Sequence, residues 1–117
     1  MKMIQDKTYE GETVVSGSGN VFADLGLSNP EERLAKAQLV HRIAEIIKER
    51  NLTQAKAGAI LGIDQAKVSK LVRGRLSEFS TSTLMEYLTR LDQDVEIVVR
   101  PKPSSRETAS LLVTIPD

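Results

Sequence analysis

Residues 52–74 read LTQAKAGAILGIDQAKVSKLVRG and contain two short helical patterns separated by a glycine. Thr53 is expected to cap the first helix, because its hydroxyl can accept a hydrogen bond from an amide two or three residues later. Gly62 follows the first apolar stripe, where a left-handed backbone ends a helix at low cost. Asp64 is expected to cap the second helix, which Gly74 ends. The stretch therefore predicts two helices joined by a tight turn.

Each expected helix has an apolar face and a polar face. The apolar residues recur at helical spacing and are expected to be buried together: Ala57, Ile60, Leu61, Val68, Leu71 and Val72. The polar face of the second helix carries Gln65, Ala66, Lys67, Ser69, Lys70 and Arg73. Such side chains can hydrogen-bond base edges or neutralise phosphates, and a helix fits the major groove of DNA. The pattern indicates a helix-turn-helix.

This stretch resembles the DNA-binding core of the Cro/repressor (XRE) family. The matching positions are a glutamine that opens the first helix, a turn glycine followed by an aliphatic residue, and a valine and a leucine buried in the recognition helix: Gln54, Gly62, Ile63, Val68 and Leu71. Four residues before the turn glycine the family usually has alanine, where this chain has Gly58. The position requires a small residue because two helices cross there. Glycine fits, and it costs about 1 kcal/mol of helix propensity relative to alanine.

The segments on both sides of this core predict further helices. Ser28, Asn29 and Pro30, followed by two glutamates, are typical of a helix start, and an apolar face continues over 30–50 until Asn51 ends it. After Gly74, a loop with Phe79 as its apolar anchor leads to the cap Ser80-Thr81-Ser82 and a helix to about Leu91. The expected fold class is mainly α, a four-to-five-helix Cro/repressor-like bundle.

Residues 95–100 (VEIVVR) are rich in β-branched side chains and predict a short C-terminal β-strand. A lone strand leaves its backbone groups without partners. Residues 110–115 could fold back to form a hairpin, or the same strand of a second protomer could pair with it. The second arrangement gives a twofold dimer, which suits a protein that reads two half-sites.

The expected domain organisation has three parts. Residues 1–29 are a flexible N-terminal arm with a short apolar turn, residues 30–100 are the helix-turn-helix domain with its strand, and residues 101–117 are a tail. Lysine and arginine outnumber aspartate and glutamate ten to three over 33–75, although the whole chain is formally neutral. A basic middle between acidic flanks is typical of a DNA-facing module.

Composition argues against several other classes of protein. There are no cysteines, so neither a disulfide nor a thiolate metal site can form. His41 is the only histidine and lacks a nucleophile partner, and no His/Asp/Glu cluster has metal-ligand spacing, so neither an enzyme, nor a metal, nor a cofactor is expected. No apolar run is long enough to span a membrane, and the expected location is the cytoplasm.

A more specific resemblance includes the segments beside the core. The helix-turn-helix together with GSGNVFADLGL and EERLAKAQL before it, and DVEIVVRP after it, is similar to small XRE-type antitoxins of the HigA type. This resemblance spans roughly 17–103. It implies a dimer that represses its own operon and sequesters a RelE/HigB-like ribonuclease toxin. The alternatives are a stand-alone XRE regulator and a helical interaction module that does not bind DNA.

The expected DNA contacts divide by role. Gln54 would bind a phosphate and fix the register, a role that the family pattern supports. Gln65 and Ala66 would meet base edges, since glutamine suits adenine and an alanine methyl suits thymine, and Ser69 and Lys70 would complete that face. Phosphate contacts are expected from the remaining basic residues: Lys67, Arg73 and Arg75.

Overall fold

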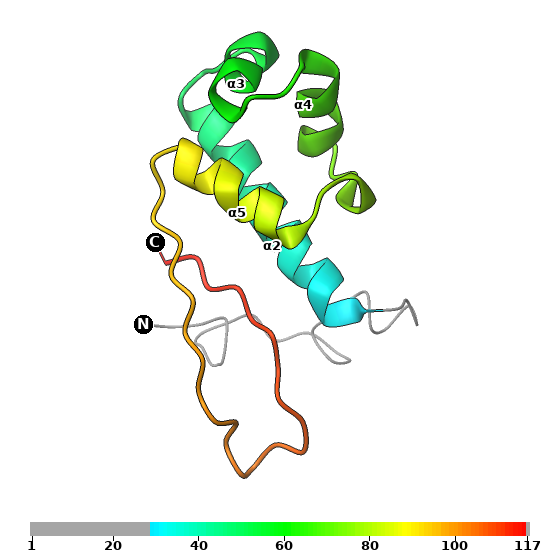
Figure 1. The fold of residues 1–117 in the computed structure, drawn as a ribbon, viewed down its shortest axis with the longest axis vertical. Helices are drawn as coiled ribbons and strands as arrows, with labels where there is room; N and C mark the ends of the chain where they lie inside the picture. The colour runs from blue at the N-terminus through cyan, green and yellow to red at the C-terminus, as the bar shows by residue number, and fades with distance from the viewer. Residues whose placement is uncertain (1–28, 117) are drawn as a thin grey trace. The chain divides into compact units, whose positions relative to one another are not determined.

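The computed structural model describes residues 29–116. They form four α-helices and one 3-10 helix: α2 (Pro30–Glu49), α3 (Gln54–Leu61), α4 (Gln65–Val72), η1 (Leu76–Glu78) and α5 (Thr81–Arg90) (Figure 1). The mainly helical fold class is confirmed. The expected N-terminal arm and its apolar turn lie outside the described residues, apart from Asn29.

The chain divides into two compact units. One is Lys36–Val95, which holds most of α2 and all of α3, α4, η1 and α5. The other combines Met1–Ala35 with Glu96–Asp117. In its described part, the Leu111 amide donates to Glu31 Oε1 at 3.1 Å, and Lys102 Nζ donates to the Arg106 carbonyl at 2.7 Å.

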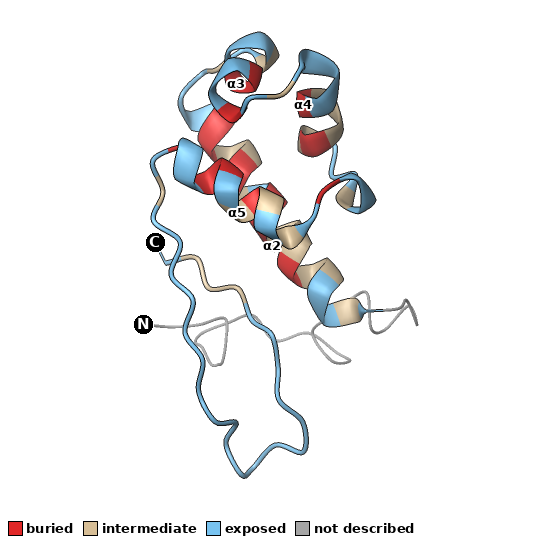
Figure 2. Ribbon diagram, in the orientation of Figure 1, coloured by how far each residue is buried: buried red, intermediate tan, exposed pale blue. Residues whose placement is uncertain are grey.

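The hydrophobic core of Lys36–Val95 is built mostly from aliphatic side chains, and each of the four α-helices contributes buried residues to it (Figure 2). Burial of this apolar surface is the main force that holds the short helices together, since helices of eight to ten residues are marginal alone. The buried residues are Leu39, Val40, Ile43, Ile46, Ile47, Ala57, Leu61, Val68, Leu71, Phe79, Leu84, Tyr87, Leu88 and Leu91.

Two residues that were expected in the core are not fully buried. Ile60 is 36% exposed and Val72 is half-buried. Both lie at the edge of the apolar stripe of a two-turn helix, where neighbouring elements cover only the central positions.

The helix ends follow local chemistry. Asn51, with φ 54°, ends α2: its amide donates to the Lys48 carbonyl at 3.0 Å, and the next amide donates to Ile47 at 3.0 Å. Ser80 caps α5 by accepting from the Thr83 amide at 3.1 Å. The sequence predicted both positions.

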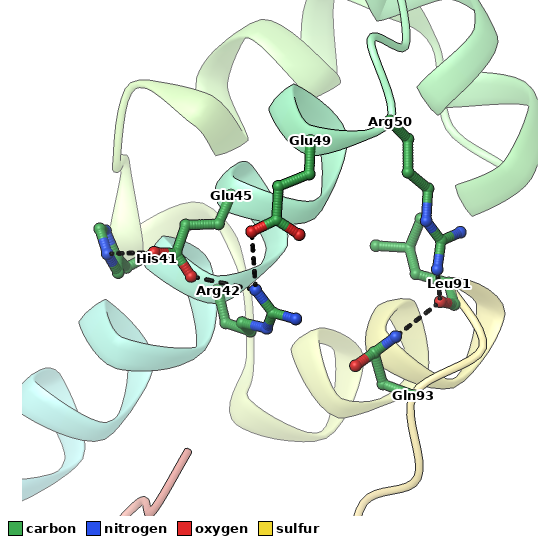
Figure 3. A network of polar contacts seen from close by, with 7 residues as sticks. All are labelled: His41, Arg42, Glu45, Glu49, Arg50, Leu91 and Gln93. Atoms are coloured by element: carbon green, nitrogen blue, oxygen red, sulfur yellow. Dashed lines mark hydrogen bonds and ion pairs between the residues drawn. The ribbon is translucent and has the colours of Figure 1, made fainter. Parts of the chain in front are cut away.

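Arginine side chains join distant parts of the bundle (Figure 3). Arg50 Nη2 donates to the Leu91 carbonyl at 2.7 Å, and Gln93 Nε2 donates to the same oxygen at 3.1 Å. Both bonds satisfy a carbonyl at the C-terminal end of α5, and the Arg50 bond ties it to the end of α2. Along α2, Arg42 pairs with Glu45 and Glu49 at 3.1 and 3.4 Å.

The prediction of a β-strand over 95–100 is wrong for the part of the chain that the structure describes. The described residues 29–116 contain no strand, and no backbone hydrogen bond joins 95–100 to 110–115 within them. β-Branched side chains favour an extended backbone, but a strand also needs a neighbouring edge to satisfy its amides and carbonyls. The segment remains extended and exposed.

None of the helices in the described residues has both the length and the apolar character needed to cross a bilayer.

Candidate nucleic-acid interface

The two helices of the motif begin at the predicted caps. Thr53 Oγ1 accepts from the Lys56 amide at 3.0 Å, and Asp64 Oδ1 accepts from the Lys67 amide at 2.7 Å. Gly62 lies between the helices with φ 78°, a conformation that glycine adopts without strain. The two N-caps fix where α3 and α4 begin, and Gly62 fixes where α3 ends.

Gly58 is required by the turn itself. The Gly62 and Ile63 amides donate to the Gly58 carbonyl at 2.7 and 3.0 Å, which brings the turn back onto α3. A Cβ on Gly58 would lie 2.5 Å from the Ile63 carbonyl oxygen and 3.4 Å from a Val68 methyl carbon. The small residue expected here therefore has to be glycine with this turn geometry, because an alanine methyl would overlap backbone.

The inner face of α4 anchors it in the bundle. Val68 and Leu71 are fully buried. Gly74, with φ 77°, ends the helix, as its amide donates to Leu71 at 3.0 Å and the Arg75 amide donates to Lys70 at 3.1 Å. This anchoring leaves the polar face of α4 toward solvent.

All eight expected DNA-contacting residues are at the surface. Exposed side chains are Gln65, Ala66, Lys67, Arg73 and Arg75, and half-buried ones are Gln54, Ser69 and Lys70. Gln54 is the first residue of α3, and Gln65 and Ala66 are the first two of α4. Arg73 Nε donates to the Ser69 carbonyl at 3.3 Å, so its guanidinium folds back along the helix. The structure thus presents one polar, basic helix face.

Sequence reasoning missed the residues that support this face from behind. Lys70 Nζ lies 3.6 Å from Glu78 Oε1, and Lys67 Nζ lies 5.7 Å from the centre of the Phe79 ring. No spacing rule connects α4 with these positions, because they come after an irregular turn. The apolar anchor role of Phe79 was predicted, but its contact with Lys67 was not.

Arg90 was also missed. Its Nη1 donates to the Leu61 carbonyl at 3.4 Å and its Nη2 pairs with Glu86 at 3.0 Å. The Arg90 guanidinium therefore lies at the C-terminal end of α3, where its positive charge interacts favourably with the negative end of the helix dipole.

Tyr87, on α5, is buried against Phe79. Its ring meets Phe79 edge to face at 6.1 Å. Burial, with a further contribution from the Glu86 carboxylate, raises the pKa of Tyr87 above its ordinary value of 10.0, while Arg90 acts in the opposite direction.

His41 lies away from this face, on α2. It is exposed, and its Nε2 is 3.3 Å from Glu45 Oε2 (Figure 3). In the described part of the chain, no group of three or more histidine, aspartate or glutamate side chains is placed to hold a metal ion.

Comparisons with known proteins agree with this geometry. The family described as "Helix-turn-helix domain" matches residues 21–100. The chain is 41% identical over 68 residues to a candidate antitoxin, HigA3, of Mycobacterium tuberculosis. That alignment covers 57% of this chain and 62% of the relative. A solved structure of a candidate XRE-family transcriptional regulator is 47% identical, with a TM-score of 0.70, and the match covers 73% of this chain and 96% of that one.

Proposed function

We infer the function of this protein from its family: the chain belongs to the helix-turn-helix domain family, of the XRE (Cro/repressor) type, and is a DNA-binding regulator. We propose that it represses transcription by placing α4 in the major groove of a double-stranded operator. The observation that carries this proposal is α4 itself, with Val68 and Leu71 buried and a polar, basic face exposed.

The proposed division of labour follows from chemistry and position. Gln65 and Ala66 begin α4, and the N-terminal end of a recognition helix is the part that reaches base edges. Lys67, Arg73 and Arg75 supply charge for phosphates, as Gln54 supplies an amide. Ser69 and Lys70 lie one turn further along α4 than the base-reading pair.

Paired substitutions test these roles. Gln65→Ala should cost about 1–3 kcal/mol on the correct operator and little on other sequences. Lys67→Ala should weaken binding to all duplexes similarly and lower the salt slope by about one. Titrations of both variants against operator and scrambled duplexes measure this, and equal losses on every sequence would contradict the assignment.

We further propose that the regulator is a dimer, and the exposed segment 95–100, called the C-terminal arm below, supports this. Ile97, Val98 and Val99 are 73%, 56% and 90% exposed, which is unusual for three successive aliphatic residues. Antiparallel pairing of this segment with a second copy, centred on Val98, would place Glu96 opposite Arg100 of the partner on both sides of the twofold axis. In this arrangement, residues 95–100 form a β-strand when they pair with the same residues of a second copy.

We also propose that this regulator is an antitoxin that represses its own operon. The support is the sequence identity to the candidate antitoxin HigA3. The aligned region covers less than two thirds of the length of that relative. The proposed protein partner is a RelE/HigB-like toxin.

Purification of the tagged protein from its host, with sequencing of bound DNA and identification of bound protein, tests this role. A stoichiometric small basic protein together with DNA from the protein's own promoter is expected. DNA from scattered promoters without such a partner would instead indicate a stand-alone regulator.

A further inference from the structure

Two consecutive residues in the turn after α4 each contact one of its lysines. Glu78 Oε1 lies 3.6 Å from Lys70 Nζ, and the Phe79 ring centre lies 5.7 Å from Lys67 Nζ. The two lysines are three positions apart, so they are neighbours on the helix surface. One short turn therefore orients both lysines of the helix that is proposed to face DNA.

This turn is fixed by its backbone and by its aromatic anchor. The Arg75 amide donates to the Lys70 carbonyl at 3.1 Å, and the Glu78 amide donates to the Arg75 carbonyl at 3.1 Å. Phe79 is buried, and its ring meets that of Tyr87 at an interplanar angle of 73°. The fold thus holds the Phe79 ring and the backbone of Glu78 beside α4, which keeps the Glu78 carboxylate within reach of Lys70.

The two contacts have opposite consequences for DNA binding. A ring face attracts an ammonium group but leaves its positive charge in place for a phosphate. A carboxylate compensates that charge and competes with phosphate for the same hydrogen-bond donors. Lys67 is therefore held with its charge available, while the charge of Lys70 is partly compensated.

We propose that Glu78 is a positioning residue that acts through Lys70. Besides its place on the base-reading face, the Lys70 ammonium attracts the phosphate backbone of any duplex, and Glu78 competes for that charge and so lowers the sequence-independent affinity of the protein for DNA. This inference rests on the proposed DNA-binding function. Lys70 and Glu78 are both partly exposed, at 44% and 42% of their side chains, so the competition is modest and depends on salt.

Glu78→Gln tests the proposal because it removes the charge and keeps the shape. Binding to a short duplex of random sequence would be followed by fluorescence anisotropy between roughly 50 and 200 mM salt. The variant should bind about two- to fivefold more tightly than wild type at the low-salt end, and the difference should shrink as salt rises.

Glu49→Gln is the matched control. It removes the same charge from a residue of α2 that pairs with Arg42. Its affinity should stay near that of wild type, and a gain equal to that of Glu78→Gln would show an effect of net charge, which overturns the proposal. Thermal unfolding of each variant confirms that the fold is intact.

A double-mutant cycle tests whether Glu78 acts through Lys70. In a Lys70→Ala background, Glu78→Gln should have no effect on affinity. An equal gain in both backgrounds would mean that Glu78 repels the duplex directly, and no gain in either would mean that the pair is irrelevant; each result overturns the proposal. If wild type binds no duplex at any salt concentration, the proposed function fails first, and this inference fails with it.

Discussion

Single residues with special backbone requirements decide the geometry of the motif. Gly62 and Gly74 have positive φ angles. The Gly58 carbonyl accepts hydrogen bonds from two amides of the turn, and its Cα lies close to the Ile63 carbonyl oxygen, so that no Cβ fits there. The first two requirements can be read from a sequence, because a glycine just after an apolar helical stripe is a familiar end signal. The close approach at Gly58 depends on where the turn carbonyl lies, which the sequence only suggests through a preference for small residues.

We predict that Gly58→Ala destabilises the protein by about 1–3 kcal/mol, although alanine is the better helix former by about 1 kcal/mol. The added methyl would lie 2.5 Å from the Ile63 oxygen, and a backbone atom cannot move aside cheaply. Chemical denaturation measures the effect.

Gly74→Ala is the comparison. No atom lies within 4 Å of its added methyl, so only the left-handed backbone, with φ 77°, opposes it, at a cost of about 1–2 kcal/mol. Stabilisation by Gly58→Ala would show that the turn relaxes and that the contact is unimportant.

At the scale of elements, the helices were predictable and the contacts between them were not. Caps and apolar periodicity located all four described α-helices, since these signals lie within each helix. Arg90 reaching the end of α3, and Phe79 lying under Lys67, join elements separated by irregular turns. The expected strand over 95–100 is not formed for the opposite reason: its local propensity is real, but within residues 29–116 no neighbouring edge pairs with it.

The burial of Tyr87, on α5, predicts that the free energy of unfolding depends on pH. The pKa of Tyr87 is raised in the folded protein above its value of 10.0, chiefly because burial disfavours the phenolate. A raised folded-state pKa means that the stability from this group is fully present below pH 10 and is lost as pH rises through the folded-state value. Unfolding free energy should therefore fall in that alkaline range.

Tyr87→Phe isolates the contribution of this residue. The variant should lose less stability than wild type over the same alkaline range, because its buried ring does not ionise. Identical pH profiles for the two proteins, measured by denaturant titration, would contradict the burial argument.

At the scale of the whole molecule, the formal net charge of zero hides a separation of charge along the chain. The basic residues gather in the segment that contains α3 and α4, and four of the exposed large apolar residues lie within 95–99. The segment proposed to bind DNA and the segment proposed to pair between two copies therefore lie in different parts of the chain, and each can be altered separately.

Charge exchange in the C-terminal arm tests the proposed dimer. Glu96→Arg and Arg100→Glu should each weaken association, because each places like charges opposite one another twice in the twofold arrangement. The double variant should recover it. Light scattering with size-exclusion chromatography measures the mass; a monomeric wild type, or a double variant no better than the single ones, would contradict Val98-centred pairing.

The central claim is that the exposed face of α4 binds DNA, and the most direct measurement is the affinity of the wild-type protein for the duplex upstream of its own gene. We predict tighter binding to that duplex than to a scrambled one of equal length, and a linear fall of log affinity with log salt concentration on both. Absence of salt-dependent affinity for any duplex would contradict the claim.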